Sequence, residues 1–141
     1  MNAPLYDTAL LRLAATIPHL GRLEGPDGSA ERRSPVCGSR VIADVKLDEE
    51  GRVTALGLDV FACALGQASA NLMASHAIGR RLGELTEARD ALATWLAGER
   101  DDPGTWPGLE RIVRARAHPG RHGAIRLPFE AIVDAVADAR R

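Results

Sequence analysis

The sequence predicts an α+β fold, in which a small antiparallel sheet carries its helices packed on one face. Two kinds of pattern lead to this class. Apolar residues recur at helical spacing near the N-terminus and throughout the second half of the chain. Between these regions, residues 40–47 alternate between apolar and polar side chains, with Ile42 as the exception, as expected for a half-buried strand. The chain has 141 residues, which we expect to form one domain over positions 1–141.

The first helix is expected over about residues 4–17, and Pro18 and Gly21 end it. The sheet is expected over about residues 22–63. Residues 22–35 are rich in glycine and proline and predict an irregular hairpin or edge strand. After strand 40–47, a short acidic turn ending in glycine leads into a second strand, from Arg52 to about Cys63.

The C-terminal part, about residues 65–140, is expected to be helical. We predict helices over 65–78, over 86–97 with Thr86 as N-cap, and over about 128–139. A short helix is expected after Pro107, with Leu109, Ile112 and Val113 on its apolar side, and His118-Pro119-Gly120 breaks the chain before the last helix. In that last helix the inward residues are predicted to be Phe129, Ile132, Val133 and Val136.

Charge and hydropathy exclude several classes of function. The 18 basic residues nearly balance 19 acidic ones, and the net charge of −1 argues against a nucleic-acid partner. No apolar run reaches the ~20 residues of a membrane span. The N-terminal segment carries Pro4, Asp7 and Arg12 instead of the core of a signal peptide. We therefore expect a cytoplasmic protein with no membrane partner, whose two cysteines, Cys37 and Cys63, are free thiols or ligands and not a disulfide.

Cys63 is the residue whose position in the sequence most clearly indicates a chemical role. It ends a predicted strand, and a helix begins within two residues. Free backbone N–H groups and the helix dipole at that point favour the thiolate, which is the form that binds metal or attacks sulfur. The alternative is that Cys63 is a small buried apolar residue, and composition alone favours this alternative.

Two segments, Pro35-Val36-Cys37-Gly38 and Phe61-Ala-Cys63-Ala-Leu-Gly-Gln-Ala-Ser-Ala70, resemble the first two cysteine motifs of the NifU/IscU-type iron–sulfur cluster assembly scaffolds. In that family the motifs are approximately P-x-C-G-D and F-x-G-x-G-C-x-I-x-x-A-S. The later segments, including Pro119-x-Arg121 and Leu127-x-Phe129, resemble the SufU-like branch, whose third motif is P-x-R-x-x-C-A-x-L-x-W. The resemblance runs from about Ser34 to the C-terminus and implies a SufE/NifU-like α+β scaffold with a three-stranded sheet.

The chain also departs from the family pattern at three positions. The third cysteine of the family falls on Ala124, and the aspartate after the first cysteine falls on Ser39. The histidine that precedes the third cysteine in the IscU branch falls on Gly123. Two of the three family thiolates therefore remain, and family membership alone does not guarantee family chemistry.

The resemblance implies that Cys37 and Cys63 are the cofactor-binding and metal-ligating residues. We predict His122 as a substitute ligand, because in an extended segment it would point to the same side as Ala124. His118, four residues earlier, is a weaker candidate at a spacing that zinc sites use. Ser39 and Asp59 are also weak candidates, from their parity with the two cysteines along the chain. These ligands would hold a two-iron, two-sulfur cluster or zinc.

Three functions remain open, and the leading one is an iron–sulfur cluster assembly scaffold that binds iron or cluster, or accepts sulfur, through two cysteines. Its partners would be a cysteine desulfurase and downstream iron–sulfur apoproteins. The second is a zinc-binding sulfur-relay protein working with a cysteine desulfurase. The third is a degenerate, non-catalytic member that only binds a partner. A scaffold or sulfur acceptor is favoured over a stand-alone enzyme, and all three readings depend on whether folding brings the two thiols to a common rim.

Overall fold

The computed structural model describes residues 6–36 and 38–141. Its strands form one three-stranded antiparallel sheet in the order β1-β2-β3. In chain order the elements are α1 (Thr8–Ala15), β1 (Gly28–Arg33), β2 (Arg40–Leu47), β3 (Val53–Phe61), α2 (Ala64–His76), α3 (Leu82–Leu96), the 3₁₀ helices η1 (Leu109–Ala117) and η2 (Pro119–Arg121), and α4 (His122–Ala139). The predicted α+β class and the three-stranded sheet are confirmed.

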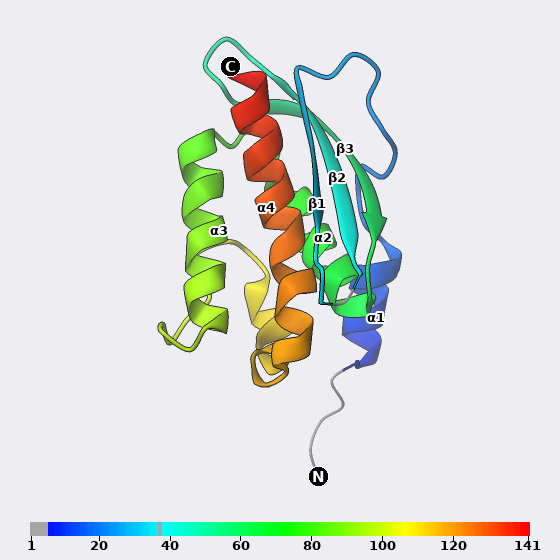
Figure 1. The fold of residues 1–141 in the computed structure, drawn as a ribbon, viewed down its shortest axis with the longest axis vertical. Coiled ribbons are helices and arrows are strands. Elements are labelled where there is room, and N and C mark those ends of the chain that lie inside the picture. The colour runs from blue at the N-terminus through cyan, green and yellow to red at the C-terminus, as the bar shows by residue number, and fades with distance from the viewer. Residues whose placement is uncertain (1–5, 37) are drawn as a thin grey trace.

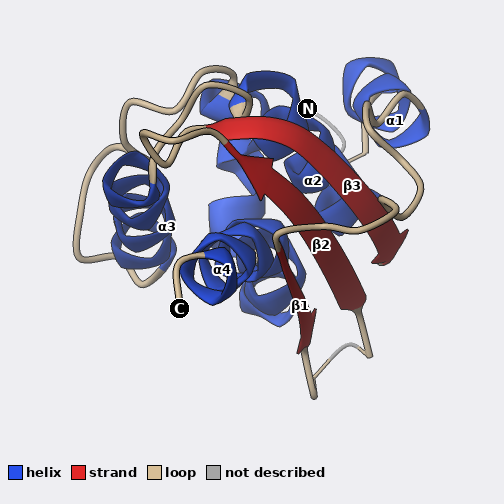
Figure 2. Cartoon of the chain, turned by 90° about the horizontal axis from the view of Figure 1, so that it is seen from above, coloured by secondary structure: helices blue, strands red, loops and turns tan. Residues whose placement is uncertain are grey.

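The helices pack in layers on one face of this sheet. The alternating residues Val41, Ala43 and Val45 of β2 are fully buried, as the sequence pattern predicts. Helix α4 lies against β1 and β2, and α3 lies on the far side of α4 from the sheet (Figures 1 and 2). Helix α2 contacts α4, and α1 packs against α2. The four predicted inward residues of α4, Phe129, Ile132, Val133 and Val136, are all buried.

The opposite face of the sheet is partly covered by the connection between α1 and β1. A Cβ added to Gly57 would lie 2.5 Å from the carbonyl oxygen of Gly21, so this connection crosses β3 in direct contact. Asp44, beneath it, is fully buried and accepts hydrogen bonds from Arg22 Nε at 2.6 Å, from the Ser29 hydroxyl at 2.5 Å and from the Leu23 N–H at 3.1 Å. The alternation had placed Asp44 on the polar side of its strand, and the structure shows that this side is closed here.

The electrostatics of Asp44 follow from these contacts. Burial opposes ionisation of the carboxyl group, but the hydrogen bonds from Arg22, Ser29 and Leu23 and the charge of Arg22 outweigh it. The pKa of Asp44 is therefore lowered, and the carboxylate ties the connection to the sheet in its charged form.

Several helix boundaries differ from the prediction. Within the described residues α1 begins at Thr8, where Asp7 Oδ1 accepts from the Leu10 N–H, and it ends at Ala15. Helix α3 begins at Leu82 and not at Thr86, because Glu84 accepts from the Arg81 N–H and stabilises an earlier first turn. The segment after Pro107 is a 3₁₀ helix in which Val113 is exposed, contrary to the predicted apolar side.

The last helix is the largest correction, because it begins at His122 and not near Pro128. Pro128 lies inside the helix and is buried. A proline is common in the first turn of a helix because it lacks an N–H, but here the Pro128 ring packs in the core while the helix continues on both sides. Positions 122–127 are therefore helical, which changes where His122 and Ala124 point. No helix in the described part of the chain is long and apolar enough to cross a membrane.

Candidate functional site

Cys63 lies where β3 gives way to α2. It is the N-cap of α2, with extended backbone angles of φ −65° and ψ 170°, and its carbonyl accepts the Gln67 N–H at 2.9 Å. The thiol is free and its residue is partly exposed. The predicted position at a strand end and a helix start is confirmed, so Cys63 is neither sealed in the core nor tied in a disulfide.

The second motif segment meets the third at the start of α4. A Cβ added to Gly66, one turn after Cys63, would lie 3.2 Å from the Ala124 Cβ. Nearby, the buried Ser69 hydroxyl donates to the Ile125 carbonyl at 2.6 Å. The small side chains after Cys63 thus permit close packing of α2 on α4, and they bring position 124, where the family has its third cysteine, to the helix end that carries Cys63.

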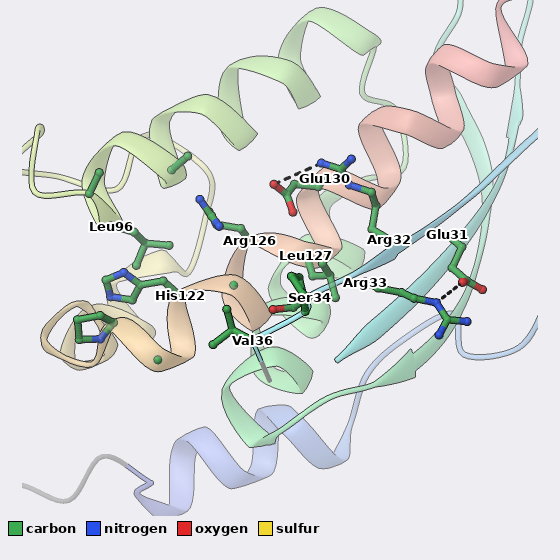
Figure 3. A pocket seen from close by; sticks show the side chains of 16 residues that line it. Glu31, Arg32, Arg33, Ser34, Val36, Leu96, His122, Arg126, Leu127 and Glu130 are labelled. Atoms are coloured by element: carbon green, nitrogen blue, oxygen red, sulfur yellow. Dashed lines mark hydrogen bonds and ion pairs between the residues drawn. The ribbon is translucent and has the colours of Figure 1, made fainter. Parts of the chain in front are cut away.

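The first motif segment also reaches the start of α4. Its loop is closed by two backbone hydrogen bonds, from Ser34 N–H to Ser39 O and from Gly38 N–H to Ser34 O, both 2.9 Å long. Gly38 has a φ of +71°, in the left-handed region that favours glycine. A Cβ added to Gly123 would lie 2.6 Å from Ser34 Oγ. Figure 3 shows Ser34 and Val36 beside the first turn of α4. All three motif segments therefore converge there.

Cys37 itself lies outside the described residues, so its role as a ligand stays a prediction. Ser39, the weak candidate of the same segment, is buried at the end of the loop that its carbonyl helps to close. The described residues on both sides of position 37 place their part of the loop near α4.

The geometric premise for His122 is wrong. The segment is helical, and residues two apart on a helix point about 200° apart. Ala124 faces α2, whereas His122 points toward the C-terminal end of α3 (Figure 3). Its Nε2 atom lies 2.9 Å from the Arg116 carbonyl oxygen, a hydrogen bond that ties α4 to η1. Metal binding by His122 stays a prediction. In the structure, the ring already has a hydrogen-bond partner in the Arg116 carbonyl.

The other weak candidates are not gathered at Cys63. His118 is exposed at the end of η1. Asp59 pairs with Ile42 in the sheet, and β3 ends at Phe61, so strand parity does not extend from Asp59 to Cys63. Within residues 6–36 and 38–141, no three His, Cys, Asp or Glu side chains are grouped closely enough to hold a metal ion. The described residues therefore do not by themselves fit a four-coordinate zinc site.

Sequence reasoning missed a groove on the other side of α4. It has a volume of about 800 Å³ and lies between β1, the C-terminal half of α3 and the first turns of α4. Arg126 points into this space from α4, and Val36 and Leu96 lie at its borders (Figure 3). Only the docking of α3 beside α4 creates the groove, so no local pattern in the sequence signals it.

Comparison with known proteins identifies similar sequences and folds. The model of the NifU-like N-terminal domain family matches residues 5–101. A NifU-like protein from Brucella abortus has a crystal structure that superposes with a TM-score of 0.89, at 33% identity over 96% of this chain and 94% of that one.

Two further relatives are more distant in sequence. The iron–sulfur cluster assembly scaffold protein IscU of Thermotoga maritima is 24% identical over 94% of this chain and 92% of its own length. A protein described as a cluster assembly scaffold of the SUF system, from Fervidobacterium islandicum, shares the fold with a TM-score of 0.85 at 20% identity, over 94% of this chain and 96% of that one. With the family model matching more than half of its length, this chain belongs to the NifU-like N-terminal domain family, whose members include iron–sulfur cluster assembly scaffolds.

Proposed function

We propose that this protein works in iron–sulfur cluster assembly, and that it receives sulfur or a nascent cluster through the thiols of Cys63 and Cys37. The observation that carries the proposal is the convergence of all three motif segments on the first turn of α4. Because of this convergence, the partly exposed thiol of Cys63 lies at the end of α2 that packs against the start of α4. Ala124 occupies the position of the family's third cysteine there.

Sulfur transfer needs fewer ligands than a complete metal site. The Cys63 thiolate attacks the terminal sulfur of a persulfide on a cysteine desulfurase, and one S–S bond forms as another breaks. The donor cysteine leaves as a thiolate, so the step needs no external oxidant or reductant. Partial exposure of Cys63 and its position at the N-terminus of α2 both suit this attack.

Iron or cluster is the cargo in this proposal. A two-iron cluster takes four terminal ligands, and Cys37 and Cys63 would supply two of them. The remaining ligands would come from outside the thiol pair, so cargo would be held more weakly than in a site with three cysteines. Such a site suits a carrier that passes its cargo to an apoprotein.

The test is anaerobic reconstitution with ferrous iron and sulfide, followed by desalting and iron and sulfide analysis. We expect the wild-type protein to retain both and Cys63→Ala to retain neither. Ala70→Ser, a buried small residue on α2, controls for damage to the helix. Equal, negligible uptake by wild type and Cys63→Ala would overturn cluster binding. Zinc near one per chain in protein purified without added iron would favour the zinc-binding relay instead.

A further inference from the structure

The two edges of the sheet differ in how far the rest of the chain covers them. The β3 edge is paired at two places: Leu58 exchanges hydrogen bonds with His19 and Gly21, and Val53 does so with Gly79 and Arg80. At the β1 edge, α4 closes one end, where Asp138 accepts the Ser29 N–H at 3.0 Å. Beyond that point the groove described above lies along the strand.

Backbone parity places free hydrogen-bonding groups on this part of β1. Ser34 N–H bonds across to Ser39 of the sheet hairpin, whereas Ser29 N–H points away from the sheet to Asp138. Successive residues of an antiparallel strand alternate in this way. The N–H and C=O groups of Glu31 and Arg33 therefore face the same outer side as those of Ser29, where an added strand would pair with them.

One basic side chain of the groove has no acidic partner among the described residues. Arg33 pairs with Glu31 at 2.6 Å, and Arg32 lies 3.5 Å from both Glu130 and Asp134. Arg126 is exposed and forms no ion pair with any described residue. It points across the groove toward α3 (Figure 3). Apolar side chains also line the groove: Leu96 and Leu127 are almost fully buried, and Val36, at its border, is 81% exposed.

We propose that this groove binds an extended acidic segment of a partner protein, which adds to the β1 edge and places a carboxylate against Arg126. Strand addition gives affinity through main-chain hydrogen bonds, and the side-chain pockets give specificity. The occupied groove ends at Val36, so the partner would be held next to the loop that contains Cys37.

The probe is a short N-acetylated peptide that alternates glutamate and valine, titrated into ¹⁵N-labelled protein while amide chemical shifts are followed. We expect shifts at β1 residues 31–33, at Leu96 and at Arg126. The same peptide with lysine in place of glutamate, or with N-methylated alternate residues, should not bind. No shifts at millimolar peptide, shifts confined to another face, or equal binding of the N-methylated peptide would overturn the proposal.

Two charge-reversal variants, one inside the groove and one outside it, test whether Arg126 itself binds the peptide. Arg126→Glu should weaken peptide binding at least about tenfold, because it replaces an attraction with a repulsion at the proposed carboxylate. Arg111→Glu makes the same change at an exposed position outside the groove and should leave affinity within about twofold. Equal weakening by both variants would show that only net charge matters and would contradict a site at Arg126. The experiment involves neither cysteine, so its outcome is independent of the sulfur chemistry.

Discussion

Ala124, on the first turn of α4, lies directly against the backbone of Gly66 on α2, one turn beyond Cys63. A Cβ on Gly66 would be 3.2 Å from the Ala124 Cβ and 3.3 Å from its carbonyl oxygen. The position where the family has its third thiolate is therefore kept in place by close helix packing, although the thiolate is gone. The alanine at this position is accommodated without opening the packing between α2 and α4.

Ala124→Cys should restore a third thiol next to the Cys63 end of α2. We expect this variant to retain at least about twofold more iron than wild type after reconstitution and desalting, since a two-iron cluster is held by four terminal ligands. Ala131→Cys, which adds a buried thiol farther along α4, is the control. If both variants retain the same iron as wild type, position 124 does not belong to the site.

His122→Ala should lower the stability of the fold more than it lowers the uptake of iron and sulfide. Removing the ring breaks the hydrogen bond to the Arg116 carbonyl, which should lower the free energy of unfolding by about 1 kcal/mol. Because His122 points toward α3, we expect iron and sulfide uptake to match wild type. Urea unfolding and iron analysis measure the two effects, and a variant of normal stability that no longer holds iron would establish His122 as a ligand.

Asp44→Asn should destabilise the protein in a pH-dependent manner. The pKa of Asp44 is lower in the folded chain than its ordinary value, so the contribution is present above about pH 4 and is lost as the pH falls through the folded pKa. At neutral pH we expect a loss of about 2 kcal/mol in the free energy of unfolding.

The difference between wild type and Asp44→Asn should therefore shrink in acid, as followed by urea unfolding at several pH values. Glu49→Gln removes an exposed carboxylate from the turn after β2 and serves as the control. A difference that stays constant down to acid pH would contradict the role of the charged carboxylate.

Gly57→Ala should destabilise the sheet, because the new methyl group would lie 2.5 Å from the Gly21 carbonyl oxygen and 2.9 Å from the Leu23 nitrogen. Both contacts are backbone and neither can move away cheaply, so we expect a loss of about 2 kcal/mol or more. Gly83→Ala in α3 has open space around it and should instead stabilise by up to about 1 kcal/mol. In thermal unfolding, the midpoint temperature should fall for Gly57→Ala and rise for Gly83→Ala.

The parts of the fold that local patterns control could be predicted from the sequence. Strand 40–47 alternates except at Ile42, and its bounds match β2. The junction at Cys63 was also predicted correctly. Residues with high strand propensity end just before it, and a run of mostly small residues follows it. These features depend on neighbours in the sequence, which are visible without a structure.

Features that depend on tertiary contacts could not be predicted in the same way. The last helix was expected to begin near Pro128, yet α4 begins at His122 and continues through Pro128, which is buried in the core. The partner of His122 comes from η1, and the buried state of Asp44 depends on a connection that crosses the sheet. The groove beside Arg126 likewise exists only once α3 has docked on α4.

The most direct test of the proposed function is transfer of sulfur to Cys63. The protein is incubated with a cysteine desulfurase and cysteine, separated from the enzyme, and examined by mass spectrometry of intact protein and of its peptides. The account predicts that wild type gains sulfur on the peptide that contains Cys63, that Cys37→Ser still does so, and that Cys63→Ser does not. Equal sulfur gain by Cys63→Ser and wild type, or none in any variant, would contradict it.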